Sequence, residues 1–129
     1  MNKIELLGRL NWLDIKYYDS GTCVTKILLA RKLPNKDEYE SFPIAFFNTK
    51  NDNTAERLAE ECKHGDYIRI VGKLRMSTYT TKDNRKQSKL EIIGWNFVKV
   101  QWDAEQNKYV DIGESSSDNM PDEDEQEAA

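Results

Sequence analysis

Hydrophobic and polar residues alternate along two runs within residues 67–100, and a polar turn at residues 80–86 separates the runs. In the first run, apolar residues and one glycine occupy every second position from Ile68 to Met76. A period of two is typical of a strand with one apolar and one polar face. The turn contains an Asp-Asn pair, so the pattern predicts a long twisted hairpin. Gly72, near the middle of the first run, indicates a bend or bulge.

Shorter strands are predicted before this hairpin, at residues 3–10, 23–31 and 41–47. The polar segment 32–40 contains a proline and several charges, and it is predicted to be a mobile hairpin loop. Pro43 cannot donate a backbone hydrogen bond, so the third strand is expected to start at a sheet edge or a bulge.

One short helix is predicted between the third strand and the hairpin. Asn53 and Glu56 have the spacing of a capping box, and Gly65 stands where helices often end. Apolar residues recur on one face of this helix: Ala55, Leu58, Ala59 and Cys62.

The resulting order is three strands, a helix and two long strands. This order predicts an all-β fold, the five-stranded Greek-key barrel called the OB-fold. A small open α+β sheet is the alternative.

Charge divides the chain into two parts. Residues 1–102 contain 18 Lys and Arg against 13 Asp and Glu, a balance of +5. Residues 103–129 contain one Lys against ten Asp and Glu, a balance of −9. Apolar periodicity stops after Trp102, so residues 1–102 are predicted to form the domain and residues 103–129 a disordered acidic tail. A basic domain of this kind favours nucleic acid as its partner.

Other classes of protein find little support in the sequence. Cys23 and Cys62 are too few for a disulfide framework or a zinc site. No apolar run of about 18 residues and no signal-peptide pattern occurs, so a reducing cytosol and no membrane partner are expected. His64 is the single histidine, and it is interpreted as a structural residue at the helix end. With no nucleophile or phosphate-loop motif, neither enzymatic activity nor a cofactor is expected.

The predicted hairpin carries cations interleaved with an aromatic residue. Tyr79 stands between the polar strand face and the turn, and both contain cations: Arg69, Lys73, Arg75, Lys82, Arg85 and Lys86. A flexible polyanion with stackable bases requires this combination. The alternative is a solvated face of a sheet protein.

Several segments occur in a characteristic order, and two of them contain Gly-Arg-Leu at residues 8–10 and Gly-Lys-Leu-Arg at residues 72–75. The full set comprises residues 2–10, 20–30, 42–47, 55–60, 64–66 and 70–75. Together they resemble the bacterial and phage single-stranded DNA-binding protein family over residues 2–100. The resemblance implies an OB-fold, usually a homotetramer, that wraps single-stranded DNA with little sequence preference in replication, recombination and repair.

The resemblance also implies roles for individual residues. Phe47 and Tyr79 match the family's stacking aromatics. Because neighbouring residues of a strand point to opposite faces, only one of Phe46 and Phe47 can point inward, and the alternative role for Phe47 is a core residue. The family has a further aromatic residue at the junction of the loop and the third strand. Ser41 aligns with that position here, and Tyr39 or Phe42 is expected to take its place. The candidate phosphate contacts are Arg9, Lys32, Lys73, Arg75, Arg85, Lys86 and Lys89. Trp95 shares the parity of its apolar neighbours, so a core or subunit contact is expected there.

Three departures from the family pattern stand out. Asn48 replaces a common glycine, and the usual Asp-Pro after the first Gly-x-Leu is missing. Met120-Pro121 precedes the acidic run, and the sequence lacks the hydrophobic tip that partner proteins grip. Docking of replication or recombination proteins in the usual way is therefore doubtful, and the unusual tail favours a phage or mobile-element origin.

The acidic tail has two interpretations, a solubility device or an electrostatic competitor of DNA for the groove. Two alternatives to single-stranded DNA binding also stay open: an OB-fold RNA-binding or RNA-chaperone module, and an OB-fold nuclease or other hydrolase.

Overall fold

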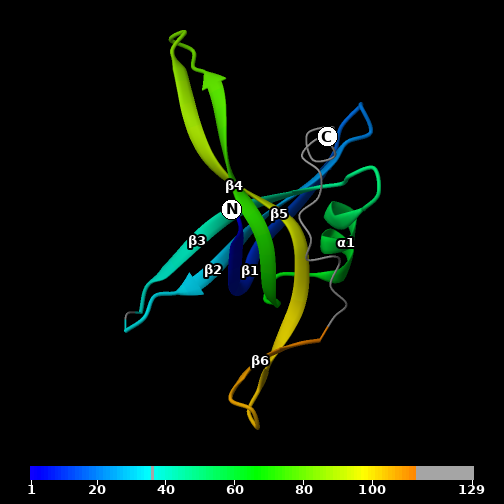
Figure 1. Cartoon of the computed structure of the whole chain (residues 1–129), viewed down its shortest axis with the longest axis vertical. Helices are drawn as coiled ribbons and strands as arrows, with labels where there is room; N and C mark the ends of the chain where they lie inside the picture. The colour runs from blue at the N-terminus through cyan, green and yellow to red at the C-terminus, as the bar shows by residue number, and fades with distance from the viewer. Residues whose placement is uncertain (36, 113–129) are drawn as a thin grey trace.

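The computed structural model describes residues 1–35 and 37–112. Within these residues the chain forms strands and one short helix (Figure 1). In chain order the elements are β1 (Ile4–Tyr17), β2 (Cys23–Lys32), β3 (Tyr39–Phe47), α1 (Thr54–Glu61), β4 (Tyr67–Thr80), β5 (Lys86–Asp103) and β6 (Lys108–Asp111). No helix among the described residues has the length and apolar character needed to cross a membrane.

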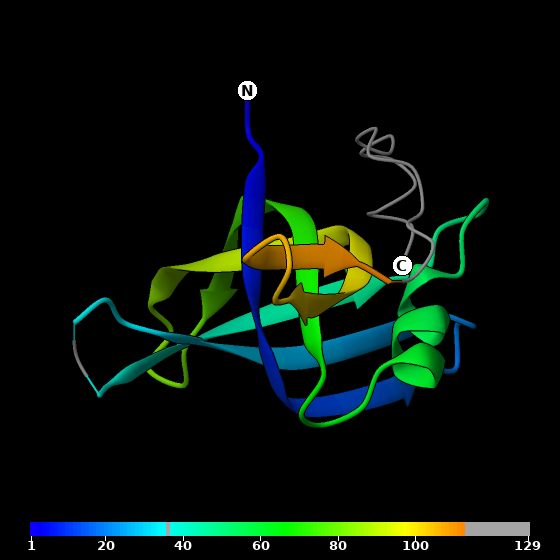
Figure 2. The ribbon, with the colours of Figure 1, turned by 90° about the horizontal axis from the view of Figure 1, so that it is seen from below.

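The strands close into a barrel. Their order is β3-β2-β1-β4-β5-β6, and β3 also pairs with β5. This closing pairing is parallel and joins Ile44, Ala45 and Phe46 to residues 92–94. Figure 2 shows α1 on one side of the barrel and the β2–β3 hairpin extending from the opposite side. The OB-fold prediction is confirmed, and the alternative of an open α+β sheet is wrong.

The core forms where inward side chains of the strands meet α1. Phe46 is fully buried and packs edge-on against Phe97, with ring centroids 6.3 Å apart. Gly94 lies against the Phe46 ring so closely that an added Cβ would stand 2.3 Å from its Cζ atom. Phe46 therefore points inward, and Phe47, which follows it, is left at the surface side of β3. Trp95 is also buried, at 6% exposed.

Strand β1 is longer than predicted. The sequence predicted a strand ending at Leu10, but β1 continues to Tyr17. Its first half pairs with β4 and its second half with β2. The register shifts between Leu10 and Trp12, so a bulge interrupts the alternation at the point where the strand changes partner.

The β4–β5 hairpin was predicted correctly. The two strands pair from Ile68 with Lys99 to Thr80 with Lys86, and the hairpin projects as an arm beyond the barrel (Figure 1). The register shifts between Val71 and Gly72, which confirms the bend expected there.

The helix is capped by a different residue from the one predicted. Asn53 is the N-cap but makes no side-chain capping bond. Instead, the backbone amides of Ala55 and Glu56 donate to Asn48 Oδ1 at 3.0 and 3.3 Å, and Asn48 Nδ2 donates to Glu56 Oε1 at 2.8 Å. The capping-box prediction is wrong. Asn48, which stands where the family commonly has a glycine, caps the helix instead.

The predicted loss of order after Trp102 is wrong for residues 103–112. Strand β5 continues to Asp103, and β6 pairs back onto Val100–Asp103. Asp103 Oδ1 accepts from the Glu105 amide at 2.9 Å within the turn. The strand was missed because four mostly exposed residues carry no apolar periodicity. The rest of the predicted tail, residues 113–129, lies outside the described residues.

Both cysteines are free and buried. Burial is the largest cause that raises the pKa of the Cys62 thiol, to about 12. His64 is exposed at the end of the helix region. The described part of the chain contains no group of three or more His, Cys, Asp and Glu that could hold a metal ion.

Candidate nucleic-acid interface

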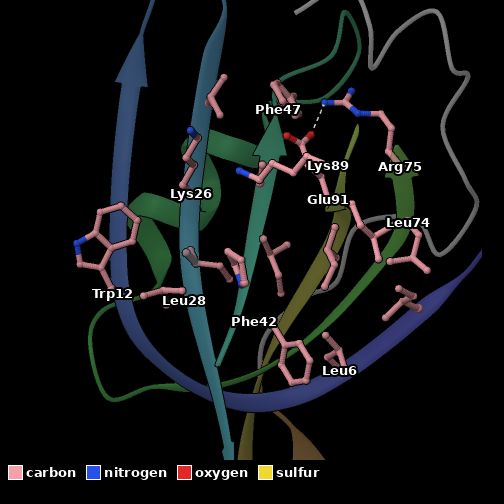
Figure 3. A pocket seen from close by; sticks show the side chains of 18 of the residues that line it. Leu6, Trp12, Lys26, Leu28, Phe42, Phe47, Leu74, Arg75, Lys89 and Glu91 are labelled. Atoms are coloured by element: carbon pink, nitrogen blue, oxygen red, sulfur yellow. Dashed lines mark hydrogen bonds and ion pairs between the residues drawn. The ribbon is translucent and has the colours of Figure 1, made fainter. Parts of the chain in front are cut away.

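A groove of about 840 Å³ opens between strands β1, β2 and β3 and the base of the β4–β5 arm (Figure 3). Most of its lining is aliphatic, and its polar margin comes mainly from long cationic side chains. The aromatic and cationic residues that line it are Trp12, Tyr18, Phe42, Phe47, Lys26, Arg75 and Lys89. A concave apolar site with cations at its margin suits bases and phosphates together.

Phe47 and Arg75 meet across this groove. Phe47 is half-buried at the end of β3, and the Arg75 guanidinium lies 5.8 Å from the centre of its ring. Arg75 Nη2 also donates to Glu91 Oε2 at 3.1 Å, the contact drawn as a dashed line in Figure 3. These contacts fix a cation beside an aromatic face, and Glu91 neutralises part of its charge.

Four of the predicted site residues come together in the groove: Phe42, Phe47, Arg75 and Lys89. Phe42 also packs against the core, so less of its ring faces the groove than its sequence position suggested.

Sequence reasoning missed other groove residues. Trp12 and Tyr18 are 47% and 49% exposed and both line the groove, as does Lys26. Trp12 pairs with Leu28 after the β1 bulge, so strict alternation from the start of β1 could not place it. The alternation along β2 could have identified Lys26. Its neighbours Thr25 and Ile27 are both buried, so Lys26 points to the opposite face of the strand.

Tyr79, Arg85 and Lys86 lie on the arm and do not line the groove. Tyr79 is 46% exposed, and its hydroxyl donates to Gln87 Oε1 at 2.9 Å. Arg85 and Lys86 are exposed at the tip and the start of β5. The arm thus extends from the groove with one aromatic and several cations along it.

Lys73 is placed differently from the prediction. It is buried, at 6% exposed, whereas its neighbours Leu74 and Met76 are 39% and 62% exposed. The bulge at Val71 and Gly72 reverses the alternation of β4, so the polar face predicted for Lys73 turns inward there. Lys73 is therefore not an accessible cation in this structure.

Arg9, Lys32 and Tyr39 lie away from the groove. They line a second pocket of about 580 Å³, to which Arg31, Tyr67 and Tyr109 also contribute. Tyr39 is 68% exposed, and Lys32 Nζ lies 3.9 Å from Asp37 Oδ1. Tyr39 and Phe42, proposed as alternatives for one role, thus line two different pockets.

A closed OB barrel with an aromatic and cationic groove defines a class of nucleic-acid-binding proteins. The model of the single-strand binding protein family matches residues 1–100, and the chain belongs to this family. This confirms the expected family. Family membership supports single-stranded DNA binding without catalysis, and it favours neither the RNA-binding nor the hydrolase alternative.

Two similar proteins agree with this assignment. A single-stranded DNA-binding protein of Clostridium tetani (strain Massachusetts / E88) is 26% identical over 113 residues, which cover 83% of this chain and 75% of the relative. A solved structure described as a Plasmodium falciparum SSB complex with ssDNA superposes with a TM-score of 0.64 at 22% identity. That match covers 78% of this chain and 96% of the other, and it supports the fold.

Proposed function

We propose that this protein coats and protects single-stranded DNA without strong sequence preference, with bases stacked in the groove and phosphates held at its margin. The observation that carries the proposal is the meeting of Phe47 and Arg75, an aromatic face and a fixed cation from separate strands. Each stacked base contributes about 1–3 kcal/mol irrespective of its identity, because every base has a flat face. Trp12 and Phe42 supply further aromatic surface in the same groove.

From the groove the strand follows the β4–β5 arm. Tyr79 stacks a base there, and Arg85, Lys86 and Lys89 contact phosphates. Each cation that neutralises a phosphate releases a counterion, so binding weakens as salt rises. Lys73 has no part in this path because it is buried.

The proposal extends to the biological setting. The protein acts as a homotetramer on DNA exposed during replication, recombination and repair, in the cytosol or nucleoid of a bacterium or of a cell infected by a phage. These features are proposed from the family resemblance.

The acidic segment 113–129 is proposed as an intramolecular competitor. It contains seven Asp and Glu and no Lys or Arg. Tethered to the domain, it reaches the basic surface at high effective concentration, and it weakens DNA binding most at low salt.

A titration with poly(dT) tests the proposal. The full chain is followed by intrinsic tryptophan fluorescence at two salt concentrations, because Trp12 lines the groove. Strong quenching and weaker binding at high salt are expected. A chain ending at Ile112 is expected to bind more tightly at low salt. Absence of binding at micromolar concentrations would contradict the proposed function, and equal affinity of the two chains would contradict competition by the acidic segment.

A further inference from the structure

The second pocket lies on the outer face of the barrel, where β1 runs between β2 and β4. Arg9 pairs with Ala30 of β2 and with Tyr67 of β4. Two residues further along β2, Lys32 pairs with Tyr39 of β3. Residues directly opposite one another in a sheet share a face, and Leu10 and Ile68, the next residues along, are fully buried in the core. The side chains of Arg9, Tyr67, Lys32 and Tyr39 therefore gather on the outside.

Cations dominate this pocket. Arg9, Arg31 and Lys32 line it, and among the described residues no Asp or Glu does so. Lys32 lies 3.9 Å from Asp37, at the outer limit of an ion pair, and both side chains are largely exposed. Three like charges around one pocket repel one another, and a bound anion removes that repulsion. The groove differs, because Glu91 lies at 3.1 Å from Arg75 there.

One wall of the pocket is aromatic and held in place. Tyr67 and Tyr109 are stacked with ring centroids 5.7 Å apart, and Trp102 packs edge-on against Tyr109 at 5.1 Å. Strand β6, which carries Tyr109, is fastened to β4 by the 3.0 Å bond from Arg69 to Asp111. Tyr67 and Tyr109 stay 43% and 38% exposed, so their rings offer surface that is already ordered.

We propose that this pocket binds one nucleotide unit of single-stranded DNA, with Arg9, Arg31 and Lys32 around the phosphate and the Tyr67–Tyr109 wall beside the base. The inference rests on the proposed function and adds a second contact point to it. A volume of about 580 Å³ lies in the range of small-ligand sites. Tyr109 lies outside residues 1–100, so a hairpin beyond the family match completes the pocket.

One strand of the sheet connects the two sites. Lys26 and Leu28 of β2 line the groove, and Ala30 and Lys32 line the pocket. Alternate residues of a strand share a face, and the six positions from Lys26 to Lys32 span about 20 Å, roughly six stacked nucleotides. A strand of DNA long enough to leave the groove along β2 therefore reaches the pocket.

The test measures binding of fluorescein-labelled dT20 to the full chain by anisotropy at 50, 100 and 200 mM salt. The double variant Arg31→Ala/Lys32→Ala is compared with Lys50→Ala/Lys63→Ala, which removes two exposed cations that line neither site. Loss of two phosphate contacts lowers the slope of log affinity against log salt by about 1.4. We expect that decrease only in the pocket variant. Equal slopes in both double variants would overturn the inference.

A second variant keeps the test independent of charge. Tyr109→Leu retains apolar packing on Trp102 and Tyr67 but removes the stacking surface, and a roughly five- to hundred-fold loss of dT20 affinity is expected. Far-ultraviolet circular dichroism and urea midpoints confirm that each variant is folded. Photocrosslinking of a 5-iodouracil-substituted dT20 is expected to label Tyr67 or Tyr109, and crosslinks confined to groove residues would refute the pocket. If the wild-type chain fails to bind dT20, the proposed function fails; if it binds and the pocket variants bind equally well, only this inference fails.

Discussion

Glu91 opposes DNA binding if the groove works as proposed, so its neutralisation strengthens binding. Its carboxylate accepts a 3.1 Å bond from Arg75, the cation beside Phe47. The substitution Glu91→Gln keeps an amide oxygen that can accept this bond and removes one negative charge. The Arg75 side chain is 32% exposed and that of Glu91 30%. The bond is part-buried, and the substitution keeps an oxygen that can accept it, so the variant is expected to stay folded.

Coulomb's law gives the size of the effect. A carboxylate about 6 Å from a phosphate is repelled by about 0.7 kcal/mol in water and by about twice as much at half the dielectric constant. Removal of the charge therefore increases affinity about three- to ten-fold at low salt. Arg75 also gains a full phosphate contact, which steepens the salt dependence by about 0.7 in the slope of log affinity.

The assay is anisotropy with labelled dT20 at 50 and 200 mM salt. Glu61→Gln is the matched control, because Glu61 accepts an Arg57 bond of the same 3.1 Å length on α1 and lines neither site. We expect tighter binding from Glu91→Gln alone, with an advantage that shrinks at the higher salt. An affinity equal to or below that of the wild type would refute the view that Glu91 offsets Arg75 in the groove.

Three further predictions concern Phe47, Asn48 and Cys62. Phe47→Leu is expected to weaken poly(dT) binding about five- to hundred-fold with little change in the urea midpoint, since the ring is half-buried; unchanged affinity would exclude stacking on it. Asn48→Ala removes the acceptor for two helix amides, so the free energy of urea unfolding should fall by about 0.5–2 kcal/mol, and an unchanged value would show that water replaces the cap. The pKa of Cys62 is raised from 9.0 to about 12, so its stabilising contribution is complete below pH 9 and is lost as pH rises toward 12. Unfolding free energies measured by urea across that range should decline more steeply than those of Cys62→Ala, by up to about 1.4 kcal/mol per pH unit, and parallel declines would contradict the assigned pKa.

The sequence predicted the elements whose signals are local and regular. The β4–β5 hairpin has a long period-two pattern and an Asp-Asn turn, and both survive in the fold. The opposed directions of Phe46 and Phe47 follow from alternation alone, and Phe46 is indeed fully buried. The barrel follows from the order of the elements, because few topologies accommodate three strands, a helix and two long strands.

The wrong predictions arise where a β-bulge adds one residue to a strand and so reverses the alternation of inward and outward side chains. The bulge before Trp12 concealed the extension of β1 and one aromatic wall of the groove. The bulge before Gly72 reversed β4, which buried Lys73 and exposed Leu74. A bulge moves every later side chain to the opposite face, and composition does not fix its exact position.

Long-range contacts account for the other differences. Asn48 caps a helix from seven residues before Ala55, outside the spacing of a capping box. Strand β6 is bonded to β4 through Arg69 and Asp111, which lie 42 residues apart, and its own four mostly exposed residues carry no apolar periodicity.

The closing pairing of the barrel has a consequence for the groove. It joins only Ile44, Ala45 and Phe46 to β5, and the residue before this seam is Pro43, which has no N–H to extend the ladder. The pairing stops there, and Phe42, the residue before Pro43, lines the groove. Each further pair between β3 and β5 would bring these two strands closer together beside the groove. Because Pro43 has no amide hydrogen, it cannot donate a bond that would lengthen this pairing toward the groove.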